Sequence, residues 1–343
     1  MKKIGILQTA FLGDTALIAC MIDKIEELYG DQAQVYLIVK KGLEDIFRYD
    51  KRIKSIIAFD KRGKQKGLLG LVKTVSAIRK LKLDVLINSH RSFRSSLVSS
   101  FAGAKKVIGF KEAVFSFLFD IRVPRKGKHE VIKNHLLLEA MDSNFKKLRP
   151  EEKGSYRLFT VFEKQVPELA KITKEPFVMI APGSKWPTKR WKKDGFLELS
   201  LAILENTNYD IIFTGDKNDR GTINYITSKI PHKYVNRVNK LTERLKISEL
   251  MFVISKARLV ITNDSAPQHL ACGFDVPVVA IFGPTTKDLG YYPFAKDSAV
   301  VEALKVKCRP CGLHGHINCP RKTHECMESI STQDVLLAVS KYL

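Results

Sequence analysis

Several segments of this chain combine small residues with charged or hydroxyl side chains, and each follows an apolar run. Residues 261–270 read Ile-Thr-Asn-Asp-Ser-Ala-Pro-Gln-His-Leu. Because the Asn-Asp-Ser part can cap a short helix, free backbone N–H groups at the helix start would favour a phosphate. Asp264 and His269 would lie at the same place, so the segment could hold both a phosphate and a polyol. An ordinary capped helix accounts for the pattern equally well.

A second segment, residues 181–191, reads Ala-Pro-Gly-Ser-Lys-Trp-Pro-Thr-Lys-Arg-Trp. Small residues after a strand leave room for a bound phosphate, and Ser184 and Thr188 can donate hydroxyl hydrogen bonds to it. Lys189 and two neighbouring basic residues add the positive charge that a diphosphate requires. A basic surface loop with anchoring tryptophans would have the same composition.

Two further segments place an aspartate at the start of a predicted helix. Gly13 permits a tight turn after the first apolar run, and Asp14 would then face a ligand cleft or simply cap the helix. Asp219 follows a similar strand end and could accept hydrogen bonds from ribose hydroxyls, although capping is the simpler account. No G-x-G-x-x-G follows the first strand, so the sequence does not favour a nicotinamide dinucleotide.

Four cysteines near the end of the chain, Cys308, Cys311, Cys319 and Cys326, are interleaved with three histidines. In a cytoplasmic protein this pattern favours a bound metal or free thiols over disulfides. The spacing departs from the common paired C-x-x-C zinc patterns, so both alternatives stay open.

The elements that must position these residues alternate between strand and helix almost throughout, which predicts an α/β fold with parallel sheets covered by helices. The predicted strands are residues 3–9, 34–39, 55–59, 85–89, 106–109, 177–181, 210–214, 259–262 and 278–282. The predicted helices are residues 15–29, 43–48, 68–81, 92–102, 195–204, 220–229, 247–256 and 333–343.

The chain has 343 residues, too many for one ordinary core, so two domains are expected. The charged segment 145–175, interrupted by prolines, is the predicted connection. Every polar segment named above falls at the carboxyl end of a predicted strand, where parallel sheets bind ligands. We therefore expect one shared site in a cleft between the two domains.

Charge is strongly positive and uneven. Lys and Arg number 58 against 36 Asp and Glu, and residues 1–150 carry 30 basic and 15 acidic residues. This excess implies an anionic partner, namely a nucleic acid, a membrane surface or a phosphorylated substrate, unless the chain is simply rich in lysine. A nucleic acid is not expected, because the basic residues are scattered and no reader motif is present.

The first 20 residues are similar to a bacterial lipoprotein signal peptide, with two lysines, an apolar stretch and a cysteine at position 20. Gly13 and Asp14 interrupt its apolar region, and cleavage there would delete the first strand. No apolar run reaches the ~18–20 residues that cross a bilayer. We expect a cytoplasmic protein.

In their order and spacing these segments resemble the family 9 glycosyltransferases, which include the ADP-heptose:lipopolysaccharide heptosyltransferases. The family pattern reads here as Gly13-Asp14, as Pro182 to Trp191, and as Asp264 to Ala271. The Cys-Arg-Pro-Cys of the tail is similar to heptosyltransferase II members. Ala266 departs from the glycine usual in the family, which bears on the identity of the donor.

The resemblance implies a GT-B fold of two facing Rossmann-like domains. Residues 1–160 would bind the acceptor and residues 175–330 the nucleotide sugar, with the C-terminal helix 331–343 packing back on the first domain. It implies an inverting transfer of heptose from ADP-heptose to the lipopolysaccharide core on lipid A, without a metal or other cofactor. Such an enzyme would work at the cytoplasmic face of the inner membrane, as a peripheral protein.

The resemblance also implies a role for each candidate residue. Asp14 would be the general base, and Lys189 would neutralise charge on the leaving diphosphate together with the helix start at Ser265 and Ala266. The remaining donor-binding residues would be Ser184 and Thr188 on the phosphates, Asp219 on the ribose, Asp264 on the sugar hydroxyls, and His269 on phosphate or sugar. The alternatives are another nucleotide-sugar transferase and a two-domain epimerase of the same fold.

Overall fold

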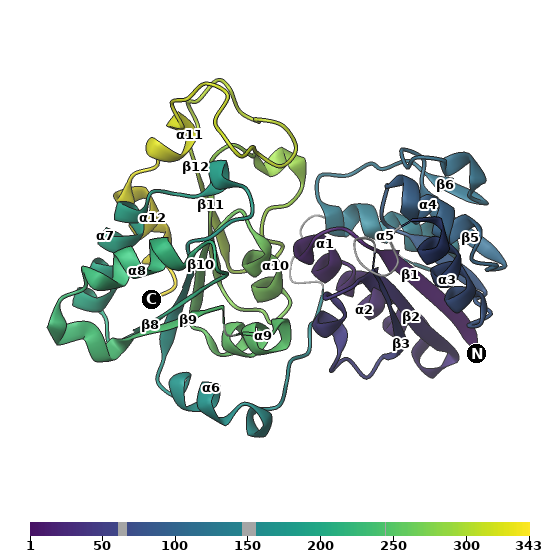
Figure 1. Ribbon diagram of the computed structural model, residues 1–343, viewed down its shortest axis with the longest axis horizontal. Helices are drawn as coiled ribbons and strands as arrows, with labels where there is room; N and C mark the ends of the chain where they lie inside the picture. The colour runs from purple at the N-terminus through teal and green to yellow at the C-terminus, as the bar shows by residue number, and fades with distance from the viewer. Residues whose placement is uncertain (61–66, 146–155, 244) are drawn as a thin grey trace. The chain divides into compact units, whose positions relative to one another are not determined.

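The computed structural model describes residues 1–60, 67–145, 156–243 and 245–343. The chain forms two compact units, Met1–Phe159 and Thr160–Leu343 (Figure 1). The sequence placed the two domains at 1–160 and 175–330, so the structure assigns residues 160–174 to the second unit. Residues 146–155 of the predicted connection lie outside the described residues.

The first unit is built on a parallel sheet in the order β3-β2-β1-β4-β5-β6. Its strands are β1 (Lys2–Gln8), β2 (Ala33–Lys40), β3 (Ile53–Phe59), β4 (Val85–Asn88), β5 (Lys106–Phe110) and β6 (Ile121–Val123). The strand order reverses between β1 and β4, and at such a point a doubly wound sheet leaves room for a ligand beyond the carboxyl ends.

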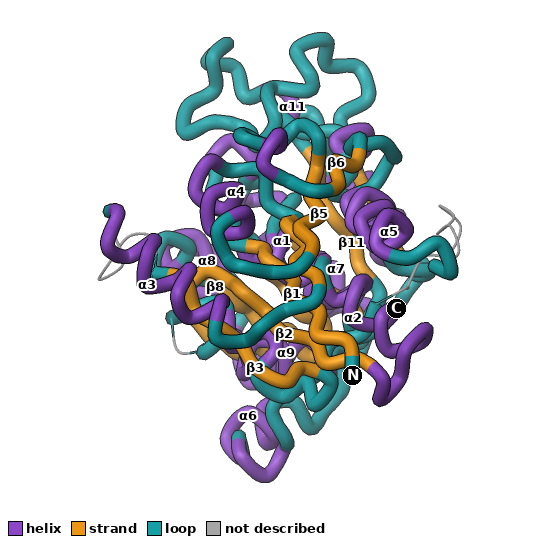
Figure 2. The backbone as a smooth tube through the Cα atoms, turned by 90° about the vertical axis from the view of Figure 1, so that its right-hand side faces the viewer, coloured by secondary structure: helices purple, strands orange, loops and turns teal. Residues whose placement is uncertain are grey.

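Helices cover this sheet. They are α1 (Leu12–Leu17), α2 (Ala19–Tyr29), α3 (Leu68–Arg79), α4 (Phe93–Ser100) and α5 (Glu130–Met141). Figure 2 shows β5 and β6 side by side, with α4 on one side and α5 on the other. The predicted helix 15–29 is in fact two helices that meet at Ile18, and the predicted helix 43–48 is only a 3-10 turn at Glu44–Phe47.

The sequence missed β6 and α5 for different reasons. β6 has only three residues, too few for a periodic pattern. In α5 the polar residues Lys133, Asn134 and His135 are buried, so the helix lacks the usual separation of an apolar and a polar face.

The second unit repeats the architecture with a parallel sheet in the order β12-β11-β10-β7-β8-β9. Its strands are β7 (Phe177–Ala181), β8 (Asp210–Gly215), β9 (Val238–Thr242), β10 (Leu259–Asn263), β11 (Val278–Phe282) and β12 (Ser298–Glu302). Its helices are α6 (Pro167–Ile172), α7 (Lys193–Asn206), α8 (Arg220–Ser228), α9 (Ile247–Lys256), α10 (Ala266–Cys272), α11 (Glu325–Glu328) and α12 (Thr332–Val339).

The strands predicted most accurately are those buried on both faces. β7 and β11 have the predicted bounds, and all their residues are buried, as expected for the centre of a parallel sheet. β9 and β12 were missed because they are edge strands with partly exposed, mixed sequences.

The C-terminal helix α12 belongs to the second unit. Its side chains Val335, Ala338 and Val339 join the core of that unit, and the helix packs on α7, β11 and β12. The expectation that residues 331–343 pack back on the first domain is therefore corrected. The reason is the apolar i, i+3, i+4 stripe, which covers the sheet that α12 reaches by a short connection from α11.

No helix among the residues that the structure describes is long and apolar enough to cross a membrane.

Candidate active site

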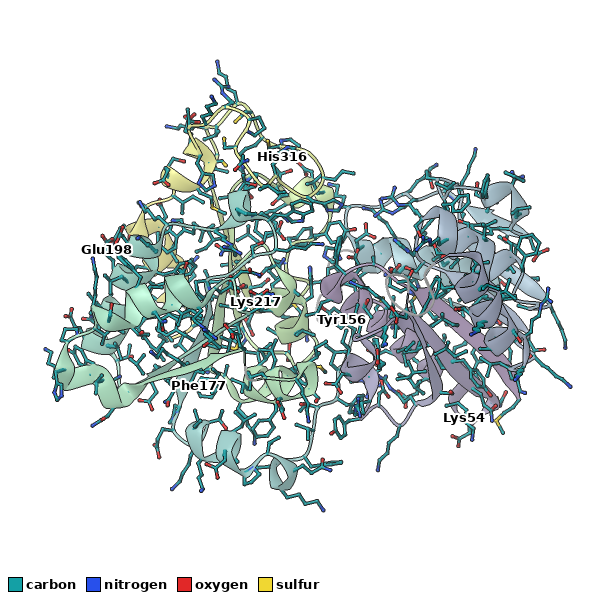
Figure 3. The ribbon with its side chains drawn as sticks, in the orientation of Figure 1. Lys54, Tyr156, Phe177, Glu198, Lys217 and His316 are labelled. Atoms are coloured by element: carbon teal, nitrogen blue, oxygen red, sulfur yellow. The ribbon has the colours of Figure 1, made fainter. Side chains whose placement is uncertain are left out.

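The candidate donor site lies at the carboxyl edge of the second sheet, where the strand order reverses between β10 and β7. The loop 182–191 follows β7, and Asp264 and Ser265 follow β10 directly. In Figure 3, Phe177, the first residue of β7, lies in the lower part of this unit, and His316 lies in the upper part. The backbone of His316 bonds to Thr188 in the loop after β7, so His316 lies at the carboxyl edge and Phe177 at the amino edge.

A buried ion pair is the centre of the site. Lys189 Nζ donates to Asp264 Oδ2 at 2.5 Å, and the two residues are only 8% and 6% exposed. A buried pair of this kind is stable only when hydrogen bonds satisfy its remaining atoms. Thr285 Oγ1 donates to Asp264 Oδ2 at 2.6 Å and Gln268 Nε2 donates to Asp264 Oδ1 at 3.0 Å. The sequence predicted Lys189 and Asp264 but missed Thr285 and Gln268.

The donors and acceptors of this network that have no partner within it suit a phosphorylated polyol. An ammonium has three N–H donors, and Asp264 takes one of those of Lys189. Gln268 also donates to the carbonyl of Tyr291 at 3.2 Å, while its Oε1 is buried without a hydrogen-bond partner in the described part of the chain. Asp264 holds Lys189 and Gln268 in place, and the pair presents donors and an acceptor to a ligand.

His269 lies beside this network as a neutral imidazole. It is almost fully buried, and its ring meets the Tyr291 ring edge-on at a centroid distance of 6.4 Å. The pKa of His269 is lowered from 6.5 to about 4, chiefly by burial; the charge of Asp264 opposes this shift and that of Lys189 adds to it. At neutral pH the His269 imidazole can donate a hydrogen bond to a ligand with one ring nitrogen and accept one with the other. Because the ring is uncharged, it adds no positive charge for a phosphate.

The lowered pKa of His269 predicts a loss of stability in mild acid. The unfolded chain takes up this proton near pH 6.5 and the folded chain near pH 4, so protonation favours unfolding as the pH falls through that interval. Between pH 7 and pH 5 we expect the free energy of unfolding to fall by about 2 kcal/mol more in the native protein than in His269→Gln. Urea unfolding at the two pH values measures this, and equal losses would contradict the neutral buried imidazole.

The loop after β7 is held from both sides by Asn263, a residue that sequence analysis considered only as a helix cap. Asn263 Nδ2 donates to the carbonyl of Pro182 at 2.7 Å, and its Oδ1 accepts from the Trp191 N–H at 3.0 Å. Inside this loop Ser184 Oγ accepts from the Trp186 N–H at 3.4 Å, which leaves the hydroxyl hydrogen of Ser184 for a ligand. The position of this amide, directly after the apolar run that forms β10, was the sequence signal that could have identified Asn263.

Asp219 also holds the loop after β7 in place. Its Oδ2 accepts from the Asp216 N–H at 3.0 Å, and Arg190 Nη2 lies 3.4 Å from its Oδ1. A Cβ at Gly183 would lie 2.1 Å from Asp219 Oδ2, so glycine is needed where the loop crosses this carboxylate. Burial raises the pKa of Asp219. The Asp219 side chain does not cap α8, so these contacts favour a role in holding the two loops together over both capping and a ribose contact.

Thr188 is turned away from the expected phosphate role. Its Oγ1 donates to the carbonyl of His316 at 2.8 Å and accepts from the His316 N–H at 2.7 Å, and its carbonyl lies 2.8 Å from His324 Nε2. The hydroxyl hydrogen of Thr188 is directed at this carbonyl, so in the structure Thr188 fastens the cysteine-rich loop to the loop after β7. A contact between Thr188 and a phosphate stays a prediction.

The helix start at Ser265 and Ala266 also differs from the prediction. Ser265 occupies the N-cap position of α10, but its hydroxyl pairs with Thr262 Oγ1 at 2.9 Å, and no side chain caps the helix. The expected Asn-Asp-Ser cap does not form, because Ser265 bonds to Thr262 of β10 and because Asn263 and Asp264 bond to the loop after β7.

The cysteine-rich loop positions Thr285. Arg309 Nη2 donates to the carbonyl of Thr285 at 2.7 Å and to Glu302 Oε1 at 3.0 Å, and the Cys311 N–H donates to the carbonyl of Pro284 at 2.6 Å. The cysteines are free thiols, and among residues 1–60, 67–145, 156–243 and 245–343 no cluster suited to a metal ion is found.

In the first unit, Asp14 lies in the first turn of α1, just beyond the carboxyl end of β1. Its Oδ2 accepts from the Phe11 N–H at 3.3 Å, which is a helix cap. Around it, at the same edge of the sheet, Gln8 Nε2 donates to Ser89 Oγ at 3.2 Å and Thr9 Oγ1 lies 2.9 Å from His90 Nδ1. A doubly wound sheet binds its ligand at such an edge, so an acceptor substrate would bind here.

An open hollow lined by Thr173, Tyr209 and Arg258 lies at the amino ends of β7, β8 and β10. Because parallel sheets bind ligands at their carboxyl ends, this hollow is not the candidate site.

Comparisons with known proteins show which family and which fold the chain shares. The family model for "Glycosyltransferase family 9 (heptosyltransferase)" matches residues 71–318. Lipooligosaccharide heptosyltransferase 2 of Campylobacter jejuni is 26% identical over 338 residues, which are 97% of this chain and 96% of that protein.

Among solved structures, a glycosyl transferase family 9 protein from Veillonella parvula superposes with a TM-score of 0.85 at 20% identity, over 99% of this chain and 97% of that one. The E. coli ADP-heptose LPS heptosyltransferase II gives a TM-score of 0.78 at 20% identity, over 100% and 98%. At these identities the likeness is one of fold. It confirms the expected α/β fold class, with Rossmann-like domains of the GT-B type.

Proposed function

Because the chain belongs to glycosyltransferase family 9, the heptosyltransferases, we propose that it transfers a heptose from ADP-heptose to the inner core of a lipopolysaccharide. The chain is thus a glycosyltransferase, and relatives along most of its length are named lipooligosaccharide or lipopolysaccharide heptosyltransferases. The observation that carries the proposal is the buried Lys189–Asp264 pair at the carboxyl edge of the second sheet.

Donor binding is assigned to the second unit. Lys189 directs its remaining N–H groups at the diphosphate, and the hydroxyl of Ser184 donates to the same group. Asp264 keeps Lys189 oriented, and His269 contacts the phosphate or the sugar as a neutral imidazole. The acceptor oxygen of Gln268 receives a hydrogen bond from a sugar hydroxyl. The contacts of Thr188 and Asp219 support structural roles for these two residues.

The transfer is a single displacement. An acceptor hydroxyl attacks the anomeric carbon of the heptose while the bond from that carbon to the diphosphate oxygen breaks, so the configuration inverts. Asp14 accepts the hydroxyl proton as general base. ADP leaves with the electron pair of the broken bond, and Lys189 stabilises the negative charge that develops on it. None of these steps requires a metal ion or another cofactor.

The acceptor is assigned to the polar edge of the first sheet, where Asp14, Gln8 and Thr9 lie. A lipopolysaccharide core is anionic and anchored in a membrane. The 30 basic residues among residues 1–150 complement its charge.

A panel of nucleotide sugars tests the donor. Ligand binding raises the melting temperature by an amount that grows with affinity, so ADP-heptose and ADP should shift it more than UDP-sugars at equal concentration. Transfer is then measured by mass spectrometry, as the gain of one heptose on a heptose-deficient core acceptor. A larger shift from a UDP-sugar, with no heptose transfer, would contradict the proposal.

Ala266 favours a second candidate function, that of a transferase of the same fold with a different donor sugar. The methyl group of Ala266 stands at the first residue of α10, where the family usually has glycine. The same panel decides between the two, because a different preferred sugar would replace ADP-heptose as the ligand with the largest shift.

A further inference from the structure

A cluster of exposed aromatic side chains lies in the first unit, at the ends of β4 and β5. Phe93 begins α4, and Phe115 and Phe117 lie in the loop between β5 and β6. The Phe115 ring is 5.1 Å from that of Phe93 and 5.7 Å from that of Phe117, centroid to centroid. We call the aromatic patch the exposed or half-exposed apolar residues Phe93, Val114, Phe115, Phe117 and Leu118.

The patch is built into the fold. The Val114 N–H donates to the carbonyl of Arg91 at 3.2 Å, which fixes the loop to the start of α4. The loop is anchored by Phe119, which is buried over Gly109; a Cβ there would lie 2.5 Å from the Phe119 ring. One aromatic residue of the loop therefore supplies the core contact, while Phe117 stays 69% exposed.

The backbone of the loop carries a second sign of function. Phe115 has φ +59°, in the left-handed region that bulky residues avoid. Such strain persists where the structure holds a side chain in a required direction. Here it places the Phe115 ring between Phe93 and Phe117, so the patch is continuous.

Positive charge surrounds the patch. Arg91 follows β4, Lys111 follows β5, and Lys126 and Lys128 follow β6. All are exposed, and none forms an ion pair within the described ranges. We call these four residues the basic rim.

The acidic groups nearby do not cancel this charge. Glu112 accepts the Arg125 N–H at 3.1 Å, Asp120 accepts the Val107 N–H at 2.6 Å, and Glu130 pairs with Arg125 and Lys133. Glu130 is thus balanced by its two cations, and the four residues of the basic rim outnumber the two remaining carboxylates, Glu112 and Asp120, so the charge of this surface stays positive.

We propose that the aromatic patch and its basic rim form a docking surface for an anionic lipid bilayer. Apolar side chains such as Phe and Leu bury at the boundary between the lipid headgroups and the acyl chains, and lysine and arginine beside them are attracted to anionic lipids. A protein partner would need complementary acidic side chains, whereas a bilayer supplies negative charge around an apolar centre without any specific shape. This inference rests on the proposed function, because an enzyme whose acceptor is anchored in a membrane must reach that acceptor at the bilayer surface.

The test is sedimentation with vesicles of phosphatidylglycerol and phosphatidylcholine in equal parts, without donor or acceptor. We expect Phe117→Ser to weaken binding by about fivefold or more, and Phe117→Trp to keep it. Lys126→Glu with Lys128→Glu should weaken binding by at least about fivefold per residue at low salt, because each exchange removes a positive charge and adds a negative one. Phe162→Ser is the matched control, because Phe162 is 55% exposed in the second unit.

Equal binding of the native protein to vesicles of phosphatidylcholine alone would overturn the role of the basic rim. Unchanged binding of Phe117→Ser, or conversion of a native dimer to a monomer by this variant, would overturn the docking surface. Transfer to a short, water-soluble acceptor is measured in parallel, and Phe117→Ser should retain it. Loss of vesicle binding with transfer intact supports the surface, whereas absence of transfer in the native protein counts only against the proposed function.

Discussion

Replacing Asp14 by asparagine is expected to lower turnover by about 10²–10⁴-fold, the usual contribution of a general base. The affinity for ADP should not change, because donor contacts are assigned to the second unit. Asparagine can still accept the Phe11 N–H, so the helix cap is kept while the base is removed. Steady-state rates with ADP-heptose and a core acceptor measure the effect.

Asp31→Asn serves as the control, since Asp31 is an exposed aspartate in the 3-10 turn after α2 of the same unit. It should retain native turnover and native stability. If Asp14→Asn also turned over at the native rate, Asp14 would be a cap and not the base.

Replacing Lys189 by methionine is expected to affect both turnover and stability. Turnover should fall by about 10²–10³-fold, because the charge that stabilises the leaving diphosphate is gone. The free energy of unfolding should fall by about 3–5 kcal/mol, because the carboxylate of Asp264 is left buried without its cation. Initial rates and urea unfolding measure the two effects.

The double variant Lys189→Met/Asp264→Asn separates the two causes. With the carboxylate neutralised, the amide of the new side chain can accept from Gln268 with its oxygen and donate to the Thr285 hydroxyl with its nitrogen. Stability should then return to within about 1–2 kcal/mol of the native protein. Turnover should stay low. Recovery of turnover together with stability would mean that Lys189 serves only to balance the charge of Asp264.

The meeting of Lys189 and Asp264 could be predicted from sequence because both follow buried parallel strands. β7 and β10 are neighbours with continuous apolar sequences, and the carboxyl ends of neighbouring parallel strands lie at one edge. The same argument placed Asp14 at the corresponding edge of the first sheet. The positions of strand ends thus predict which residues lie at the same edge of a sheet. They do not predict which side-chain atoms form hydrogen bonds within the protein.

The direction of the Thr188 hydroxyl could not be predicted, because its partner His316 is 128 positions away in an irregular loop. Thr285 and Arg309 were missed for a similar reason: each acts through a backbone or side-chain contact that crosses between loops. The placement of α12 was taken from family resemblance, whereas the apolar stripe of Val335, Ala338 and Val339 packs it on the second sheet.

The Lys189–Asp264 pair as the diphosphate-binding centre is tested most directly by calorimetric titration of ADP into three proteins. The native protein and Asp14→Asn should bind ADP with the same Kd within about twofold, whereas the stable double variant Lys189→Met/Asp264→Asn should bind it about 10- to 100-fold more weakly, the value of a charge-assisted hydrogen bond. Unchanged ADP affinity in the double variant, or a weakened affinity in Asp14→Asn alone, would contradict the account.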